Sequence, residues 1–342
     1  MENKKALKNF TEAEMKEFMK EIGEKAFRGT QVYSWIYKSA KTFDDMKNIP
    51  KSLREKLEEV SYIGNIDIEL KLESKDGKTK KYLFLLNDGN IIETVMMDYD
   101  SRVTVCVSNQ VGCRMGCRFC ASTMDGLVRN LEPWEILDQI MKIQEDTGKR
   151  VSNLVLMGSG EPLDNYDNTK QFLKIVNDEN GLNIGYRHIT LSTCGIVPKI
   201  YELADLEIPI NLAISLHSPY DDKRKEIMPV ANKYSINEIL DACRYYIKKT
   251  NRRVTFEYSL IKGVNDGKKE AEALAALLKG MLCHVNLIPI NEVDERDFKK
   301  PDKAFIYKFR DYLEERNIPA TVRISMGSDI SGACGQLRRK HK

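Results

Sequence analysis

The sequence CRMGCRFC, residues 113–120, decides how the rest of this chain is interpreted. It places Cys113, Cys117 and Cys120 just after residues 103–107, an apolar run typical of a β-strand. This spacing lets one short loop wrap three thiolates around a single inorganic centre. Cuboidal iron–sulfur clusters normally take four cysteine ligands, so three ligands leave one iron open, as in sites that perform chemistry. We therefore predict one catalytic [4Fe–4S] cluster on this loop.

Two other interpretations of these thiols stay open from their spacing. A disulfide would require an oxidising compartment. A structural zinc site usually combines paired C-x2-C units with a fourth Cys or His, and no His lies near this loop. In the zinc case, the chain would be a non-catalytic RNA-binding module.

Length and composition are typical of a soluble, compact protein. The chain has 342 residues, of which 42% are hydrophobic and 31% are charged, which suits one large domain with a smaller appendage. The N-terminal sequence MENKK is no signal peptide, and no apolar run reaches membrane-spanning length, so we expect a cytoplasmic protein without a membrane partner. The eight cysteines are then expected to be ligands, catalytic thiols or core residues. A net charge of +3 neither requires nor excludes a nucleic-acid partner.

The pattern of the chain divides it into three parts. Residues 1–60 predict a small helical accessory domain, in which Thr11 and Glu14 form a capping box before an amphipathic run. Residues 61–99 alternate with period two and contain Asp-Gly turns at 76–77 and 88–89, which predicts a linking β-meander. Residues 100–342 alternate between strand and helix patterns, which predicts a parallel sheet covered by helices.

About six strand–helix units favour a partial (β/α)6 barrel over a full eight-stranded one. In such barrels the chemistry lies at the carboxyl ends of the strands, and unusual residues do follow the expected strands. The expected strands are residues 103–107, 153–157, 188–192, 211–216, 254–258, 284–289 and 320–325. The expected helices are residues 132–145, 168–176, 236–248, 268–278 and 303–315.

The C-x3-C-x2-C spacing resembles the signature of the radical S-adenosylmethionine (SAM) superfamily. Such an enzyme binds SAM on the open iron, so that the cluster has three cysteine ligands plus SAM. In the sequence GSGE, residues 158–161, Gly160 leaves a strand edge without a side chain, so the amino-acid part of SAM can pair with it. The Glu161 carboxylate can bind the SAM ammonium group. The other expected SAM contacts are Ser192, Ser215, Leu216, His217 and Asn291 at the following strand ends.

Further motifs make the resemblance specific to the RlmN/Cfr family of radical SAM RNA methyltransferases. They are CVSNQVGC (106–113), MGSGEPL (157–163), SLH (215–217), GVND (263–266), NLIP (286–289) and ACGQL (333–337). The similarity extends through nearly the whole chain, including the N-terminal helical part. It implies methylation of adenine C2 in 23S ribosomal RNA and in transfer RNA. The alternative is a Cfr-type enzyme that methylates adenine C8 in ribosomal RNA.

The resemblance also implies a role for each of three residues outside the cysteine loop. Cys334 accepts a methyl group from one SAM and becomes S-methylcysteine, and a second SAM supplies the radical, so two are used per turnover. Glu93 is the proton acceptor. Cys106 forms a transient disulfide with Cys334 that frees the product. A radical SAM activase that acts on another protein would not need Cys334, and it remains an alternative.

Two positions depart from the family pattern, although neither removes an expected ligand. The SAM motif contains Ser159 where Met is frequent, and Cys194 follows the third strand where Ser or Ile is common. The RNA contacts are expected from basic residues at the rim, with Arg114, Arg118, Arg129 and the basic tail 338–342 as candidates. An external electron donor such as flavodoxin or ferredoxin is expected to reduce the cluster.

Overall fold

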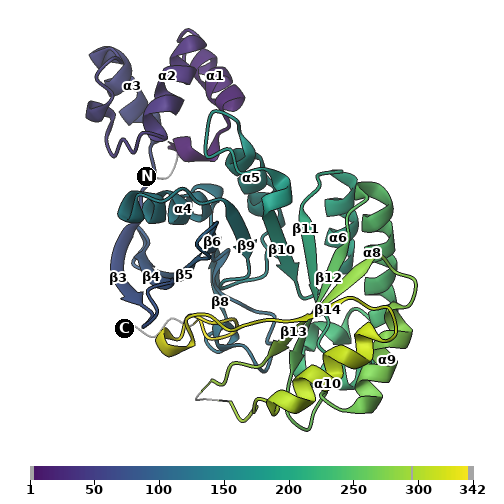
Figure 1. Cartoon of the computed structure of the whole chain (residues 1–342). Coiled ribbons are helices and arrows are strands. Elements are labelled where there is room, and N and C mark those ends of the chain that lie inside the picture. The colour runs from purple at the N-terminus through teal and green to yellow at the C-terminus, as the bar shows by residue number, and fades with distance from the viewer. Residues whose placement is uncertain (1–3, 294–295, 338–342) are drawn as a thin grey trace.

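A ten-stranded sheet organises the protein in the computed structural model, which describes residues 4–293 and 296–337. Its strand order is β14-β13-β12-β11-β10-β9-β6-β5-β4-β3, and the strands from β6 to β14 run parallel (Figure 1). The partial radical SAM barrel is thereby confirmed. The parallel strands are β6 (Val103–Cys106), β9 (Asn153–Leu156), β10 (Ile189–Thr193), β11 (Asn211–Ser215), β12 (Val254–Leu260), β13 (Cys283–Pro289) and β14 (Ala320–Val322).

Helices connect these strands and cover the outside of the curved sheet (Figure 1). They are α4 (Pro133–Thr147), α5 (Tyr166–Asn177), α6 (Val197–Asp205), α7 (Asp221–Ile227), α8 (Ile236–Thr250), α9 (Lys268–Leu278) and α10 (Lys303–Glu314). The sequence patterns predicted all of these except α6 and α7. The seven residues of α7 are mostly charged, so they show no apolar period. None of the helices that the structure describes is both long enough and apolar enough to cross a bilayer.

The predicted meander is present and continues the same sheet. Its strands β3 (Asp67–Glu73), β4 (Thr79–Leu85) and β5 (Ile91–Asp98) are antiparallel, and β5 pairs antiparallel with β6. The register places Lys81 opposite Val95, and Val95 opposite Cys106. Cross-strand partners project from the same face, so the meander and the first barrel strand present one common surface.

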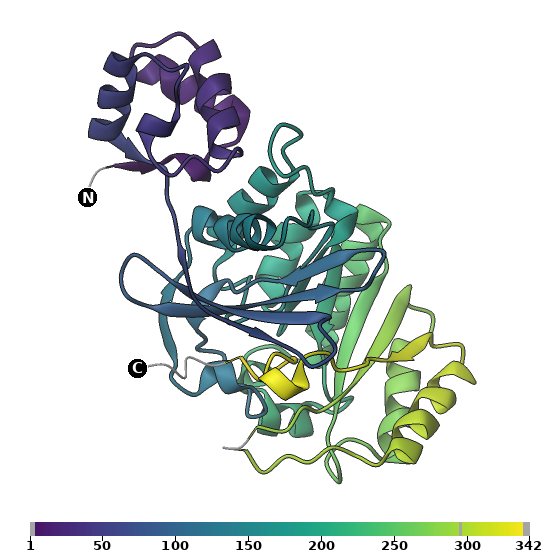
Figure 2. The ribbon, with the colours of Figure 1, turned by 60° about the vertical axis from the view of Figure 1, so that its left-hand side comes forward.

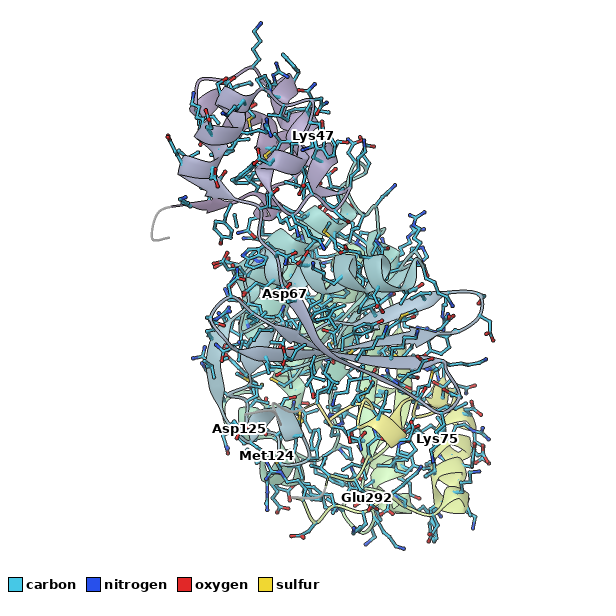
Figure 3. All side chains as sticks on the ribbon, turned by 90° about the vertical axis from the view of Figure 1, so that its left-hand side faces the viewer. Lys47, Asp67, Lys75, Met124, Asp125 and Glu292 are labelled. Atoms are coloured by element: carbon cyan, nitrogen blue, oxygen red, sulfur yellow. The ribbon has the colours of Figure 1, made fainter. Side chains whose placement is uncertain are left out.

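The N-terminal helices form a separate unit with its own apolar core. The unit contains α1 (Glu12–Glu21), α2 (Phe27–Ile36) and α3 (Lys51–Val60), closed by the short parallel pair β1 (Lys5–Ala6) and β2 (Ser61–Tyr62). The predicted capping box of Thr11 and Glu14 is present. Figures 2 and 3 show the unit, which carries Lys47, standing apart from the barrel, with Asp67 where the chain enters the meander. A buried ion pair of Lys8 and Asp138, 2.5 Å long, joins it to α4.

Beyond β14 the chain returns across the sheet towards the meander, as the yellow ribbon shows in Figures 1 and 2. Main-chain groups hold much of this C-terminal segment, residues 323–337. The Asp329 carboxylate accepts from the Lys75 amide at 3.0 Å, and the Ser331 carbonyl accepts from Lys81 Nζ at 3.2 Å. The Gly335 carbonyl accepts from the Ala121 amide at 2.8 Å. The segment therefore lies between the meander and the cysteine loop. The basic tail 338–342 lies outside the described residues.

Candidate active site

The cysteine loop lies between two short strands that the sequence patterns did not predict. These are β7 (Gln110–Gly112) and β8 (Leu127–Asn130), which pair antiparallel. Gly112 has φ +76°, and a Cβ there would lie 2.0 Å from the Gly126 carbonyl oxygen, so only glycine fits where the loop begins. The Arg118 amide donates to the Ile227 carbonyl at 2.9 Å, which docks the loop on α7. Main-chain contacts thus fix both ends of the loop.

The three thiols of this loop line one cavity at the carboxyl ends of the parallel strands. The cavity encloses about 970 Å³, including space open to solvent. Burial raises the pKa of all three thiols, that of Cys113 to about 12. Without a metal, Cys113, Cys117 and Cys120 are therefore protonated at neutral pH.

The donor set fits an iron–sulfur cluster. Among residues 4–293 and 296–337, no three His, Cys, Asp or Glu side chains lie close enough to share one metal ion. A cubane binds each of its cysteines to a different iron, so its ligands need not converge on one point. Bound iron would also keep the thiols ionised despite their burial.

The predicted SAM motif follows β9 and reaches into the same cavity. Gly160 has φ +108°, and a Cβ there would lie 2.6 Å from Gln110, so glycine is required. The Glu161 carboxylate is 4% exposed and accepts from the Leu163 amide at 3.0 Å and the Cys194 amide at 2.7 Å. Burial raises the pKa of Glu161. A cationic ligand such as the SAM ammonium group would stabilise this buried carboxylate.

Most of the other predicted SAM contacts also line the cavity. They are Ser192, Ser215, His217 and Asn291. Leu216 is fully buried and lies in the apolar core instead, and its backbone groups bond to other protein groups. Asn291 donates through Nδ2 to the Cys334 carbonyl at 3.0 Å, so it also positions the C-terminal segment.

His217 is held in an unusual conformation. Its φ is +58°, in the left-handed region that few residues other than glycine adopt. Its Nδ1 accepts from the Ser259 amide at 2.9 Å, and its ring meets Phe119 edge to face at 4.8 Å between centroids. Burial lowers the pKa of His217 to about 3, so the imidazole is neutral.

Cys334 lines two adjoining cavities. It borders the cluster cavity and also a smaller one that contains Cys106. Both thiols are free in the structure. Burial raises the pKa of Cys106 to about 12, and a thiolate at Cys334 would add to this effect. The structure therefore brings Cys334 next to both the cysteine loop and Cys106.

Glu93 is not in the cluster cavity. Its side chain is buried on β5, its carboxylate lies 2.7 Å from Lys81 Nζ, and it lines a third cavity together with Ser122 and Leu337. Ser122 also lines the cluster cavity, and its hydroxyl donates to the Leu337 carbonyl at 2.7 Å. Ser122 thus borders both the Glu93 cavity and the cluster cavity, whereas Leu337 borders the Glu93 cavity and the cavity that contains Cys106.

Sequence reasoning missed four charged residues around these cavities. Arg323 lines the cavities on both sides of Cys334, and a thiolate there would raise the pKa of Arg323. It lies just after β14 but within residues 320–325, which the sequence patterns predicted as strand, so the strand-end rule did not single it out. Glu257 lies within β12, Lys81 within β4 and Arg224 within an unpredicted helix, so that rule did not apply to them.

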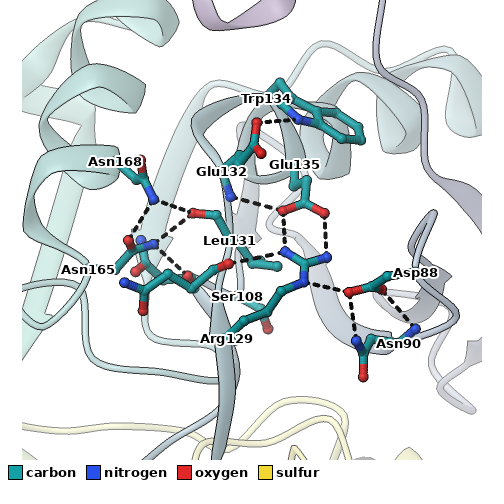
Figure 4. Close-up of polar contacts among 12 residues, drawn as sticks. Asp88, Asn90, Ser108, Arg129, Leu131, Glu132, Trp134, Glu135, Asn165 and Asn168 are labelled. Carbon is teal, nitrogen blue, oxygen red and sulfur yellow. Dashed lines mark hydrogen bonds and ion pairs between the residues drawn. The ribbon is translucent and has the colours of Figure 1, made fainter. Parts of the chain in front are cut away.

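The three basic residues proposed for the rim differ in how strongly they are held. Arg129 forms ion pairs with Asp88 at 2.5 Å and with Glu135 at 2.7 Å, so this candidate has a structural role (Figure 4). Arg114 binds Asp164 at 2.6 Å, although its side chain is 60% exposed. The Arg118 guanidinium donates to a backbone carbonyl, that of Glu226, at 3.4 Å.

The family scan and the search of known proteins show which family the chain belongs to. Residues 107–278 match the radical SAM superfamily, and residues 5–63 match the ribosomal RNA large subunit methyltransferase N-terminal domain. A "probable dual-specificity RNA methyltransferase RlmN" of Clostridioides difficile is 84% identical over 343 residues, covering 100% of both chains. A protein of the same name from Alkaliphilus oremlandii is 62% identical, covering 98% of both chains.

A solved structure is also similar over the full length. The crystal structure of a radical SAM methyltransferase from Sphaerobacter thermophilus has a TM-score of 0.93 and 45% sequence identity, and covers 98% of this chain and 100% of its own. Identity at this level over whole chains shows common membership of a family, not only a shared fold. The chain therefore belongs to the RlmN family of dual-specificity RNA methyltransferases, within the radical SAM superfamily.

Proposed function

We propose that this RNA methyltransferase methylates C2 of adenine in 23S ribosomal RNA and in transfer RNA through a methylated cysteine. The observation that carries the proposal is the position of Cys334, which lines the cluster cavity on one side and the Cys106 cavity on the other. A sulfur placed in this way can accept a methyl group in the cluster cavity. The Cys106 sulfur on its other side can then attack it and release the product.

Cys113, Cys117 and Cys120 would hold the [4Fe–4S] cluster, with SAM on the remaining iron. When bound and reduced by a donor such as flavodoxin or ferredoxin, the cluster supplies the electron that splits SAM and yields a carbon radical. Gly160 and Glu161 would bind the amino-acid part of SAM, and Ser192, Ser215, His217 and Asn291 would bind its ribose and adenine. Leu216 would contribute to this site only by fixing the backbone between Ser215 and His217.

Cys334 carries the methyl group in this proposal. Its thiolate attacks the methyl carbon of a first SAM, the S–CH3 bond forms, and S-adenosylhomocysteine leaves. The second SAM of the turnover provides the radical that removes one hydrogen atom from this methyl group. The resulting carbon radical adds to adenine C2, which is too electron-poor to attack SAM directly, and the adduct gives up one electron, for which the oxidised cluster would be the acceptor. The nucleobase and Cys334 are then joined through one carbon.

Two further residues complete the turnover. Glu93 accepts the proton from adenine C2, and its carboxylate lies 2.7 Å from Lys81 Nζ. The Cys106 thiolate then attacks the Cys334 sulfur, which forms a disulfide and breaks the carbon–sulfur bond to the product. The released carbon takes up a proton and becomes the methyl group, and an external reductant returns the disulfide to two thiols.

The decisive experiment identifies the modified base. Protein reconstituted anaerobically with iron and sulfide is incubated with methyl-labelled SAM, a reductant, and 23S ribosomal RNA or transfer RNA. Nucleosides from the digested RNA are then separated by mass spectrometry. Labelled 2-methyladenosine from both RNAs is the expected result. Formation of 8-methyladenosine alone would assign the Cfr-type reaction, and no labelled nucleoside from either RNA would overturn the proposal.

A further inference from the structure

Arg224 on α7 is a fully buried cation, 0% exposed. No Asp or Glu among the described residues forms an ion pair with its guanidinium, although Asp221, in the first turn of the same helix, interacts with it electrostatically. A buried charge is costly unless an opposite charge or hydrogen bonds compensate it. The protein must therefore gain something from this charge.

Three carbonyl groups account for part of this compensation. Nη2 donates to the Cys194 carbonyl at 2.7 Å and to the Ser215 carbonyl at 3.2 Å, and Nε donates to the Leu216 carbonyl at 3.1 Å. The Cys194 carbonyl follows β10, and the Ser215 and Leu216 carbonyls lie at the end of β11. Arg224 therefore connects two strand ends that border the cluster cavity. The remaining nitrogen, Nη1, is buried and has no hydrogen-bond partner among the described residues.

The same helix supports the cysteine loop. Cys117 belongs to a buried apolar cluster with Ile227 and Met228, which lie three and four residues after Arg224 in the chain. Cys194, whose carbonyl accepts from Arg224 Nη2 at 2.7 Å, belongs to the same cluster as Cys117. The guanidinium therefore lies within electrostatic reach of a predicted cluster ligand.

We propose that Arg224 is the buried counter-cation of the iron–sulfur cluster, a positioning residue whose charge makes the cluster easier to reduce. This inference rests on the proposed binding of the cluster by Cys113, Cys117 and Cys120. Reduction adds one electron from a low-potential donor, makes and breaks no bond, and takes up no proton. The cluster and its thiolates then carry one more negative charge, which a nearby cation stabilises more strongly than the oxidised state.

The test compares variants that separate charge from hydrogen bonding. Arg224→Gln removes the charge and keeps N–H donors for the carbonyls. Arg224→Lys keeps the charge but loses the planar guanidinium and its fixed arrangement of N–H donors. Lys225→Gln is the matched control, because it removes an exposed positive charge from the next residue of the same helix. Each reconstituted full-length protein is analysed for iron and sulfide content, and its midpoint potential is measured by electron paramagnetic resonance during a redox titration.

We expect the midpoint potential of Arg224→Gln to shift to more negative values, while Arg224→Lys and Lys225→Gln stay close to the wild type. An unchanged potential in Arg224→Gln, or equal shifts in the Gln and Lys variants, would overturn the inference and leave Arg224 a structural role. If Arg224→Gln does not fold, Arg224→Met removes the charge instead, and an unchanged midpoint potential in that variant would overturn the inference. Wild-type protein without iron and sulfide would instead refute the proposed cluster.

Discussion

The cluster cavity and the Glu93 cavity share Ser122 in their linings, yet they are built in different ways. The loops and strand ends of the parallel barrel form the first, which collects almost every residue proposed to bind the cluster and SAM. The start of the antiparallel strand β5, the segment that follows the cysteine loop, and Leu337 of the C-terminal segment line the second. The proposed reaction needs both, because the methyl carrier borders one and the base borders the other.

This difference shows that the protein positions its proposed functional residues in two ways. Parallel strands bring cofactor-binding loops together at one edge, whatever the sequences of the individual loops. The proposed base instead lies on a regular ladder, where its neighbours are fixed by register. The C-terminal segment contacts both regions, so the position of Cys334 determines whether they act together.

The largest effect is expected from the residue that borders the cluster cavity and the Cys106 cavity. Cys334→Ala removes the methyl carrier, so we expect RNA methylation to fall below detection in the labelled-SAM assay. Iron and sulfide content should stay at the wild-type level, since Cys334 is not a proposed ligand. Cys243→Ala is the control, because Cys243 is buried in the barrel core, and it should retain activity. Product formation by Cys334→Ala would refute the methylcysteine route.

A smaller loss is expected from the Glu93 cavity alone. Glu93→Gln keeps the size of the side chain but removes the base, so methylation should fall by about 10²–10⁴-fold. Methyl transfer to Cys334 precedes the proton transfer and should proceed normally. The joined protein and RNA should therefore accumulate and appear as a slowly migrating band on a denaturing gel. Glu69→Gln, on an exposed part of β3, should behave as the wild type.

The ion pair behind the base gives a third test, this time of stability. Both partners are nearly buried, with 7% of Lys81 and 5% of Glu93 exposed. Removing one partner of a buried pair costs about 3–5 kcal/mol, so we expect Lys81→Met to lower the free energy of unfolding in urea by that order. The double variant Lys81→Met, Glu93→Gln should lose less than the sum of the two single losses.

Lys80→Met is the control for this cycle. Lys80 is the neighbouring residue on β4 and pairs with Glu73 at 3.5 Å at the surface. Its loss should change the free energy of unfolding by no more than about 0.5 kcal/mol. Strictly additive effects of the Lys81 and Glu93 variants would show that the two side chains are not coupled.

The effect that is smallest at neutral pH concerns His217 in the cluster cavity. Burial lowers its pKa from 6.5 to about 3, so the folded chain leaves the imidazole neutral while the unfolded chain protonates it. The contribution of His217 to the free energy of unfolding should therefore be fully present above pH 6.5. It should decrease by about 1.4 kcal/mol for each pH unit as the pH falls towards 3. His217→Asn, which tolerates the left-handed conformation, should flatten this dependence in urea unfolding between these limits. The exposed His188→Gln should leave it unchanged.

The sequence predicted the architecture well because its signals are local. Alternating strand and helix patterns located the barrel, and Thr11 with Glu14 located the start of α1. The spacing of the cysteines indicated the cluster because three ligands lie within one loop. The strand-end rule then predicted most residues of the cluster cavity, since parallel strands bring their ends together.

What the sequence could not predict depends on contacts between distant residues. Lys81 lies within a strand, and only the register of β4 and β5 brings it to Glu93. Arg224 lies in a short charged helix that looks like an exposed turn, yet it is fully buried under two strand ends. Leu216 was expected to touch SAM because it lies between two such residues, but alternation along the chain turns it into the core.

The pairing of β5 with β6 has a consequence for how this enzyme tolerates sequence change. Val95 lies opposite Cys106, and Glu93 precedes Val95 by two residues, so the proposed base and the resolving sulfur project from the same face. A slip of one residue between these strands would send them to opposite faces. Insertions in the hairpin loops can lengthen the chain harmlessly. A shifted pairing of β5 and β6, by contrast, would leave a folded protein with its proton acceptor and its second sulfur on different sides of the sheet.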